Sequence, residues 1–304
     1  MKKIMVLVLV CFIISHHPLK AQYYYYNNKY YDNAVVFELG VGGGVMNSLT
    51  DLGGKAGTGK NFIKDLRWKT AKPSYGAYFA ATYNDVVTAR LEATFGQVAG
   101  YDSILKPVAS STFGRYERNL SFKSKISEFS LTLEVHPLFF KTYDDDPPRL
   151  SPYLMGGVGY FSFDPQAQLN GQWYSLQPLR LEGQGFAEYP DREPYKLSQV
   201  NFLAGLGLRY ELNSMFRMRL ELVHRILKTD YLDDVSTGYI DANLFYNYLS
   251  ANQAAIAQKL YYRRPELIPM DALPFDEQRG DQTDNDSYFT IQFKIGMMLG
   301  RQRR

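Results

Sequence analysis

Cysteine is almost absent from this chain of 304 residues, which contains only Cys11. That residue lies in an apolar run of about eleven residues, Ile4–Ile14, which follows a short basic start. A basic start and an apolar run of this length are typical of a secretory signal, and we predict cleavage after Ala21. A lipid anchor on Cys11 is disfavoured because Val10 precedes it where a small residue is expected. The mature chain then has no cysteine, which excludes disulfide bonds and cysteine chemistry.

The mature chain also lacks long apolar runs and net charge. No segment approaches the roughly 20 apolar residues that a membrane-spanning helix needs. The formal charge of +3 falls to 3 − 3 = 0 when Lys2, Lys3 and Lys20 leave with the signal. No basic excess remains to indicate a nucleic-acid partner. Tyrosine is instead abundant, with 25 residues against 19 phenylalanines.

Apolar and polar residues alternate in eight segments, which is the period of a β-strand. In the stretch from Phe216, for example, Met218 and Leu220 share one face, whereas Arg217 and Arg219 share the other. Each segment has about 10–13 residues, longer than usual strands of ~5–6 residues and close to the ~9–11 that cross a bilayer. The segments are Ala34–Gly44, Pro73–Tyr83, Val86–Gln97, Lys125–His136, Ser151–Phe163, Gln199–Leu212, the stretch from Phe216, and Ser287–Leu299.

The connections between these segments alternate strictly between short and long. The short ones contain Asn84-Asp85, Lys141–Arg149 and Asn213-Ser214. The long ones are 45–72, 98–124, 164–198 and 229–286. Transmembrane barrels have short periplasmic turns and long outer loops, and an even strand number lets the sheet close without free edges. A soluble β-sandwich, the alternative fold, gives no reason for this segregation.

One face of the segments carries nearly all the charge. Charge on a lipid-facing position costs roughly 2–4 kcal/mol at the bilayer centre, so this face should line the interior. Because eight strands enclose only enough space for side chains, we predict a packed, ion-paired lumen without an open pore. Its residues are Glu38, Arg90, Glu92, Glu128, Glu134, Arg209, Arg217, Arg219, Glu221 and Lys294. We expect aromatic girdles from Tyr75, Tyr83, Tyr153, Tyr210, Phe216 and Tyr288.

Two further segments carry recognisable patterns. Residues 241–264 have apolar residues at rough helical spacing, which predicts a helix at the outer mouth. The N-terminal run of tyrosines is either a partner-binding segment or an adhesive tail; its candidate binding residues are Tyr23, Tyr24, Tyr25 and Tyr26.

Candidate chemistry is sparse. The segment Gly54–Lys60 approaches a P-loop, but Asn61 replaces the magnesium-binding hydroxyl, so a flexible loop is favoured. A rim lipase would need Ser and an acid around His136. Asp230, Asp233, Asp234 and Asp241 could bind calcium, but they lack EF-hand spacing. A solvated acidic loop or an Asx turn is therefore the expectation there. We therefore predict no enzyme activity, no cofactor and no metal.

Three motifs resemble the PorG-like outer-membrane β-barrel family of bacteria with a type IX secretion system. They are FELGVGGG from Phe37 with DLGG at Asp51, the stretch Pro152–Gly185, and YLDDVSTGY from Tyr231. The resemblance implies an eight-stranded barrel that associates with the lipoprotein-containing periplasmic ring of that machinery, and it connects the chain with gliding motility. The chain departs from the family in its long final loop, its Tyr-rich start and its end, GRQRR, which lacks a terminal aromatic residue.

These observations predict an all-β protein, an eight-stranded antiparallel transmembrane barrel in the bacterial outer membrane. The leading function is that of a scaffold subunit in type IX secretion, docking periplasmic partners at the inner rim; the alternative is a surface-binding or adhesion barrel. Asp230, Tyr231, Asp233 and Asp234 would form an extracellular rim motif. The expected parts are the signal peptide (1–21), a Tyr-rich periplasmic segment (22–33), the barrel (34–299) with its long extracellular loop (229–286), and a basic tail (300–304).

Overall fold

The computed structural model describes residues 34–52, 68–105, 110–141, 147–269 and 277–299. The predicted signal peptide, Tyr23 to Tyr26, the P-loop-like segment and the basic tail all lie outside these residues.

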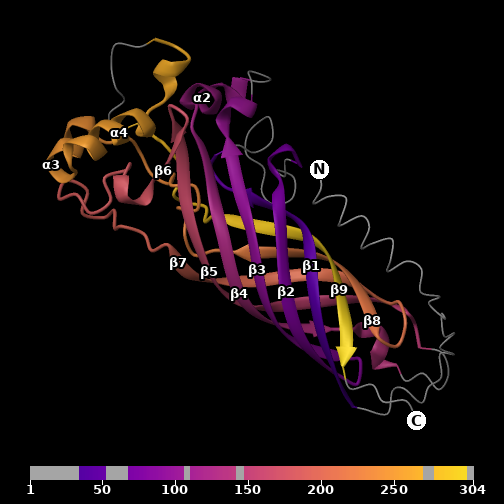
Figure 1. The fold of residues 1–304 in the computed structure, drawn as a ribbon. Helices are drawn as coiled ribbons and strands as arrows, with labels where there is room; N and C mark the ends of the chain where they lie inside the picture. Colours follow the sequence, from indigo (N-terminus) through magenta and orange to yellow (C-terminus); the bar gives the residue numbers. More distant parts are fainter. Residues whose placement is uncertain (1–33, 53–67, 106–109, 142–146, 270–276, 300–304) are drawn as a thin grey trace, which may run out of the picture.

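Eight long strands and one short strand form a single sheet (Figure 1). Their extended runs follow from the alternation in the sequence, because one face of each strand is buried and the other exposed. The strands are β1 (Val35–Leu49), β2 (Lys72–Tyr83), β3 (Val87–Tyr101), β4 (Ser121–Val135), β5 (Leu150–Leu169), β6 (Gln172–Ser175), β7 (Ser198–Glu211), β8 (Phe216–Ile226) and β9 (Ser287–Leu299).

The sheet closes into an eight-stranded antiparallel barrel, as predicted. Neighbours follow the order β4-β3-β2-β1-β9-β8-β7-β5, and β4 also pairs with β5, so every long strand has two partners. The closing β4–β5 register runs from Lys123 opposite Gln166 to Val135 opposite Leu154. Closure leaves no free edge among the long strands, which satisfies the backbone groups along the whole wall.

The turns at one end are short. Asn84 and Asp85 both have positive φ, of 47° and 58°, which the two-residue hairpin between β2 and β3 requires. Between β7 and β8, the Asn213 side-chain oxygen accepts hydrogen bonds from the backbone N–H groups of Met215 and Phe216, each at 2.8 Å. The β4–β5 connection begins with a 3₁₀ turn, η5 (Pro137–Phe140).

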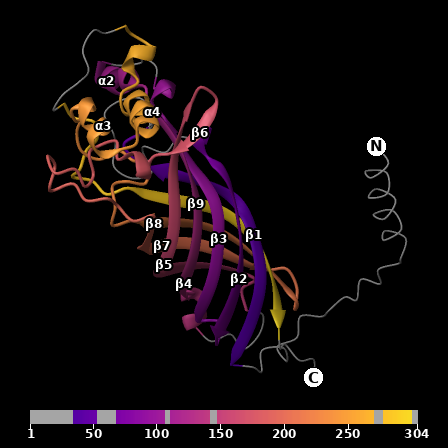
Figure 2. The same ribbon diagram turned by 60° about the vertical axis from the view of Figure 1, so that its left-hand side comes forward.

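The other end carries the long connections and the three α-helices found among the described residues (Figures 1 and 2). These helices are α2 (Ser110–Arg118), α3 (Phe245–Tyr248) and α4 (Ala251–Tyr261). The helix predicted in residues 241–264 is confirmed as α3 and α4, whereas α2 was not predicted. Several strands also continue further than predicted at this end: β5 reaches Leu169, where Asn170 and Gly171 turn into the short hairpin strand β6. No described helix has the length and apolarity to cross a membrane.

The barrel is apolar outside and charged inside, the reverse of a soluble domain. Outward-facing residues on every wall are large, apolar and exposed, including Leu39, Leu91, Phe129, Leu154, Leu206, Leu220 and Phe293. Among the expected girdle residues, Tyr75, Tyr83 and Tyr210 are exposed. Tyr153 and Tyr288 are only 1% and 0% exposed, so their assignment to the girdle was wrong. Their positions along the strands place them on the inner face with the charges.

Glycines make room for the inner tyrosines. A side chain at Gly40 would collide with the ring of Tyr78 on the neighbouring strand, and one at Gly207 would collide with the ring of Tyr153. The bare backbone therefore lets each ring lie across the adjacent strand, where its hydroxyl reaches a buried glutamate. Both glycines thus shape the interior of the barrel.

Candidate functional site: a filled lumen between two structured rims

Strand β8 contributes one charged side chain to each of four levels of the lumen, as viewed along the strand from its short-turn end. At the first level, the Arg217 guanidinium pairs with Glu211 (Nη2–Oε1, 2.7 Å) and with Asp85 of the β2–β3 turn (Nη2–Oδ1, 2.9 Å). Arg209 lies 3.3 Å from the same Asp85 carboxylate and covers the Phe139 ring of η5. The short-turn end of the barrel, which we call the inner rim, is thus closed by ion pairs and the Phe139 ring.

Arg219 is the centre of the second level. It donates to both Glu38 oxygens, at 3.1 Å from Nε and 2.9 Å from Nη2, and to Glu134 Oε2 at 2.7 Å from Nη1. The Tyr78 hydroxyl donates to Glu38 as well. One guanidinium from β8 therefore bridges two carboxylates, from β1 and β4, and Arg217 and Arg90 supply further positive charge to Glu38 and Glu134.

At the third level, Glu221 accepts from Arg90 through both oxygens, at 2.5 and 3.0 Å. Lys294 Nζ bridges Glu221 at 2.8 Å and Glu92 at 2.5 Å. Arg90 also lies 2.9 Å from Glu134, which connects this level to the one below. Such shared partners make a continuous network in which the loss of one charge leaves others unpaired.

The fourth level centres on Glu128. Its carboxylate accepts from Arg225 at 3.1 Å, from the Tyr288 hydroxyl at 2.6 Å and from the Asn201 amide at 2.7 Å. Above it the interior becomes apolar, around Phe122 and Phe161. The lumen therefore ends in a hydrophobic plug before the outer loops begin.

All ten residues predicted to line the lumen are buried, and none exceeds 7% exposure. The structure adds Glu211, Arg225 and the turn residue Asp85 to this set. The same alternation that identified Arg217 and Arg209 could have found Arg225 and Glu211, since they occupy the same face of β8 and β7. The buried strand residues of the described barrel then comprise six glutamates and six basic residues, which balance.

The long-loop end of the barrel, which we call the outer rim, is a cap in which four loops interlock. Arg118, at the end of α2, pairs with Asp102 at 2.8 Å and donates to the backbone oxygen of Asp51 at 2.9 Å. Arg279 Nη1 lies 2.8 Å from Glu182. The same Glu182 carboxylate accepts from the backbone N–H groups of Ser236 and Thr237, so it joins the β5–β7 loop to the final loop.

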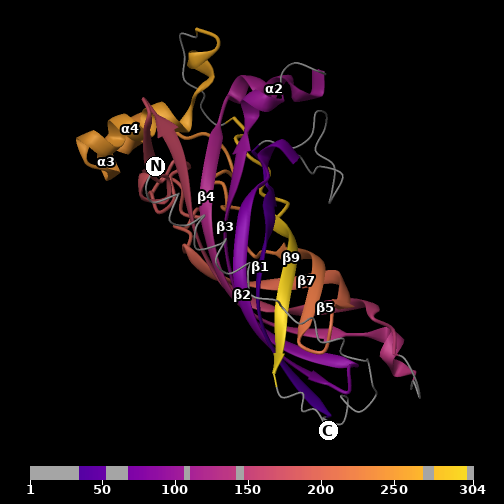
Figure 3. The same ribbon diagram turned by 45° about the vertical axis from the view of Figure 1, so that its right-hand side comes forward.

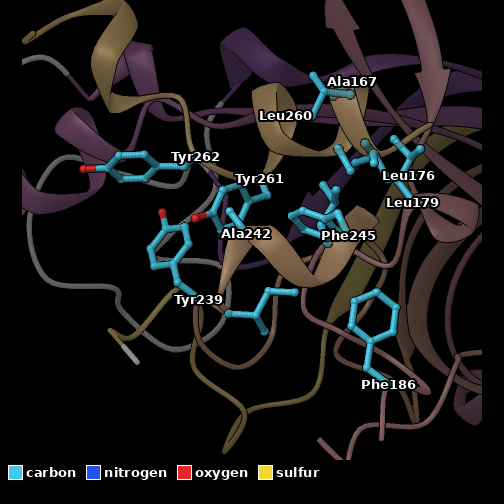
Figure 4. Close-up of a cluster of buried hydrophobic side chains, with 14 residues drawn as sticks. Ala167, Leu176, Leu179, Phe186, Tyr239, Ala242, Phe245, Leu260, Tyr261 and Tyr262 are labelled. Atoms are coloured by element: carbon cyan, nitrogen blue, oxygen red, sulfur yellow. The ribbon is translucent and has the colours of Figure 1, made fainter. Parts of the chain in front are cut away.

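The cap has a hydrophobic core of its own (Figure 4). The ring of Tyr261 meets that of Phe245 at 5.3 Å, and Tyr239 lies edge-on to both Tyr261, at 5.6 Å, and Tyr262, at 5.4 Å. Phe186 of the β5–β7 loop stacks on Tyr248 at 4.1 Å. These contacts show why the helices α3 and α4 lie flat across the cap instead of extending into solvent.

The YLDD motif lies at the outer end but inside the cap. Asp233 and Asp234 are fully buried, so the expectation of a solvated acidic loop was wrong. Asp233 Oδ1 accepts from the backbone N–H of Val235, which confirms the alternative of an Asx turn, while its Oδ2 accepts from Leu52 of the first loop. Tyr231 stacks on Tyr195 at 4.8 Å, and the Tyr195 hydroxyl donates to Asp234 at 2.6 Å.

Several carboxyl groups crowd together around this motif. Burial raises the pKa of Asp230 to about 9 and that of Asp233 to about 8, and the charge of Asp51 adds to the effect at Asp233. Burial likewise raises the pKa of Asp234 to about 7. The pKa of Asp286 is also raised, by burial and then by the charges of Asp233 and Asp230. The cap therefore favours protonated carboxyl groups near neutral pH.

The inner rim exposes apolar side chains. In η5, Phe139 faces Arg209, whereas Phe140 is 67% exposed. Met215 of the β7–β8 turn is exposed as well. His136, the residue considered for a rim lipase, is buried between Thr88 and Tyr153. Among the described residues, no group of three or more His, Cys, Asp or Glu side chains could hold a metal ion.

These features define the class of protein: a closed antiparallel barrel with an apolar outer wall, a filled and ion-paired interior, and a structured cap. Residues 26–177, half of the chain, match the profile of a family described as Domain of unknown function (DUF6089), and the chain belongs to that family. No curated protein matches this chain.

Solved barrels resemble this structure loosely. Ail of Yersinia pestis, in complex with the heparin analogue sucrose octasulfate, is 8% identical; the match covers 88% of this chain and 100% of that one, with a TM-score of 0.38. The N-terminal barrel domain of Pseudomonas aeruginosa OprF is 9% identical, with coverages of 88% and 98% and a TM-score of 0.34. Neisserial surface protein A is 6% identical, with coverages of 86% and 96% and a TM-score of 0.37. Likenesses this weak carry no information about function.

Proposed function

We propose that this protein is a non-enzymatic barrel of the bacterial outer membrane and serves as a scaffold subunit of a type IX secretion assembly. The observation that carries the membrane part is the inverted wall, with apolar residues outside and paired charges inside. Lipid-exposed backbone must be fully hydrogen-bonded, and a closed barrel meets that condition.

A scaffold role is favoured over a pore because the lumen is filled. Four levels of paired side chains and an apolar plug occupy the described interior. The protein therefore offers its two rims, and not a channel, to other molecules.

The inner rim supplies a suitable docking surface. Phe140 and Met215 project from the β4–β5 and β7–β8 connections. Phe139 of the first connection and Asp85 of the neighbouring β2–β3 turn contact the lumen arginines. A rigid base that presents exposed apolar side chains fits a partner such as a periplasmic ring lipoprotein, which is the partner that the PorG-like motifs imply. Aromatic anchors of this kind commonly dominate interface energies.

Affinity purification from detergent-solubilised outer membrane tests this proposal. We expect the wild-type protein to recover type IX ring components and the Phe140→Asp variant to lose most of that recovery, since losing a central aromatic anchor commonly costs about 2 kcal/mol or more. Phe113→Asp, an exposed phenylalanine on α2 at the opposite rim, is the matched control and should recover them normally. Recovery of wild-type barrel without any type IX component would count against the scaffold role.

A second function, binding at the cell surface, is favoured by one observation: the outer loops form an ordered cap with its own core. Deleting residues 239–282 distinguishes surface binding from the scaffold function. If the cap is the working surface, the deletion abolishes binding to surface ligands while the barrel still assembles. If the inner rim is the working surface, the same deletion leaves recovery of periplasmic partners intact.

A further inference from the structure

The apolar wall ends abruptly in lysines on one side of the barrel. On β4 the outward-facing residues from Val135 to Phe129 are apolar, whereas those nearer the cap are Ser127, Lys125 and Lys123. On β8 the last outward residue is Ile226, and Lys228 follows two positions later. Lys196, exposed just before β7, occupies the corresponding position on that strand. We call Lys123, Lys125, Lys196 and Lys228 the lysine belt.

The belt lysines lie close together because only β5, which carries no belt lysine, separates β4 from β7 and β8. Lys125 lies opposite Asp164 of β5 in the β4–β5 register. On the other side of β5, the Phe163 N–H donates to the Leu197 carbonyl, which brings Lys196 beside the same part of β5. Lys125 and Lys196 are therefore about two strand spacings, roughly 10 Å, apart.

The positive charges of the belt are not neutralised within the described protein. None of the four lysines forms an ion pair with a described carboxylate. Asp164, the acidic residue between them, instead accepts from Gln166 at 2.6 Å and from Ser175 at 3.1 Å.

Aromatic rings hold two of these ammonium groups against the wall. Lys123 Nζ lies 3.5 Å from the centre of the Trp173 ring on β6, and Lys228 Nζ lies 5.2 Å from that of Phe202 on β7. A lysine that stacks on a ring gains from the cation–π contact and still has N–H donors that are not directed at the ring. The belt is thus a positioned set of donors directly above an apolar surface.

We propose that the lysine belt binds the phosphate groups of a phosphorylated lipid headgroup whose acyl chains cover the apolar wall below it. This inference rests on the proposed membrane location but not on the secretion role. The outward-facing apolar residues up to Phe129 on β4 and Ile226 on β8 contact the acyl chains. The lysines contact the anionic headgroup at the level where the acyl chains end. Each lysine near an anionic lipid surface contributes on the order of a fivefold preference.

The test uses the full-length protein in neutral maltoside micelles, with fluorescent bisphosphorylated lipid A as the probe. We expect saturable binding that unlabelled lipid A displaces. Replacing Lys125 and Lys196 by glutamine should weaken it roughly 25-fold, from two fivefold losses. Lys141→Gln, an exposed lysine at the opposite rim, is the matched control and should bind like wild type. Dephosphorylated lipid A should compete poorly.

The outcomes are distinguishable. Equal binding by the K125Q/K196Q variant and wild type overturns the proposal, as does equal competition by dephosphorylated lipid A. Displacement by inorganic phosphate at comparable concentration would assign the belt to free phosphate and would also overturn the lipid assignment. Heat-modifiable gel mobility shows that each variant is folded. A wild-type protein found in the soluble periplasm would instead refute the membrane location, whatever the micelle assay shows.

Discussion

Replacing Arg219 with methionine is expected to destabilise the barrel by about 3–5 kcal/mol, the usual cost of removing one partner from a buried ion pair. Methionine retains much of the volume of the side chain but removes two hydrogen bonds to the Glu38 carboxylate and one to Glu134. Urea unfolding of the protein in phospholipid vesicles, followed by heat-modifiable gel mobility, measures the change.

Two further variants show whether the cause is electrostatic. Adding Glu38→Gln to the Arg219→Met protein should recover part of the loss, because the uncompensated charge is removed while the Tyr78 hydroxyl keeps an acceptor. Leu220→Met, on the outer face of the same strand, should cost less than about 1.5 kcal/mol. If Arg219→Met changes the unfolding free energy by less than about 0.5 kcal/mol, the ion-pair network does not stabilise this barrel.

The outer cap is expected to loosen as the pH rises from about 5 to 9, while the barrel stays folded. Asp233 and Asp234 have pKa values of about 8 and 7 in the folded cap against 3.8 for an unperturbed aspartate. The folded state therefore holds protons that the open loop releases. The two groups give the folded cap their full stabilisation below about pH 4. This stabilisation is lost as the pH rises through their folded-state pKa values of about 7 and 8. Each such proton costs about 1.4 kcal/mol per pH unit within this window.

The test is the protection factor of peptides from the final loop, measured by hydrogen exchange across this pH range and corrected for the intrinsic rise of exchange with pH. Asp234→Asn should flatten the pH dependence near pH 7, since asparagine also tolerates the positive φ of 66° at this position. Asp281→Asn, an exposed aspartate in the same loop with a lowered pKa, should leave the dependence unchanged. Protection factors that stay constant between pH 5 and 9 in the wild-type cap would contradict the predicted effect.

The alternation of side chains was enough to predict the barrel. In a run such as Phe216 to Leu222, the period of two shows which residues share a face of the strand. Across the strands, ten charged residues fall on the same face, which indicates that this face lines the interior. The alternation of short and long connections predicted which end would carry the loops. Figure 3 shows the outcome, with long strands that lean together and helices gathered at one end.

The same reasoning failed where a residue's partner is far away in sequence. Tyr153 and Tyr288 were placed in a girdle from their position near strand ends, yet their rings fill the lumen beside Glu221 and Glu128. An interior tyrosine and an interfacial one differ only in which face of the strand they occupy. In the Gly-rich β5 that face is hard to identify, because glycines interrupt the pattern.

Local periodicity and loop length were enough to establish the sheet: its eight strands, their two faces and the end at which the loops lie. The side-chain pairings could be found only in the folded chain. Arg219 meets Glu38 across 181 positions of the chain, and Asp233 meets Leu52 across the same number. Those contacts depend on closure of the sheet and on the folding of the loops over it. For that reason Asp233 and Asp234, which were predicted to lie in a solvated loop, are buried in the cap, and their pKa values are raised.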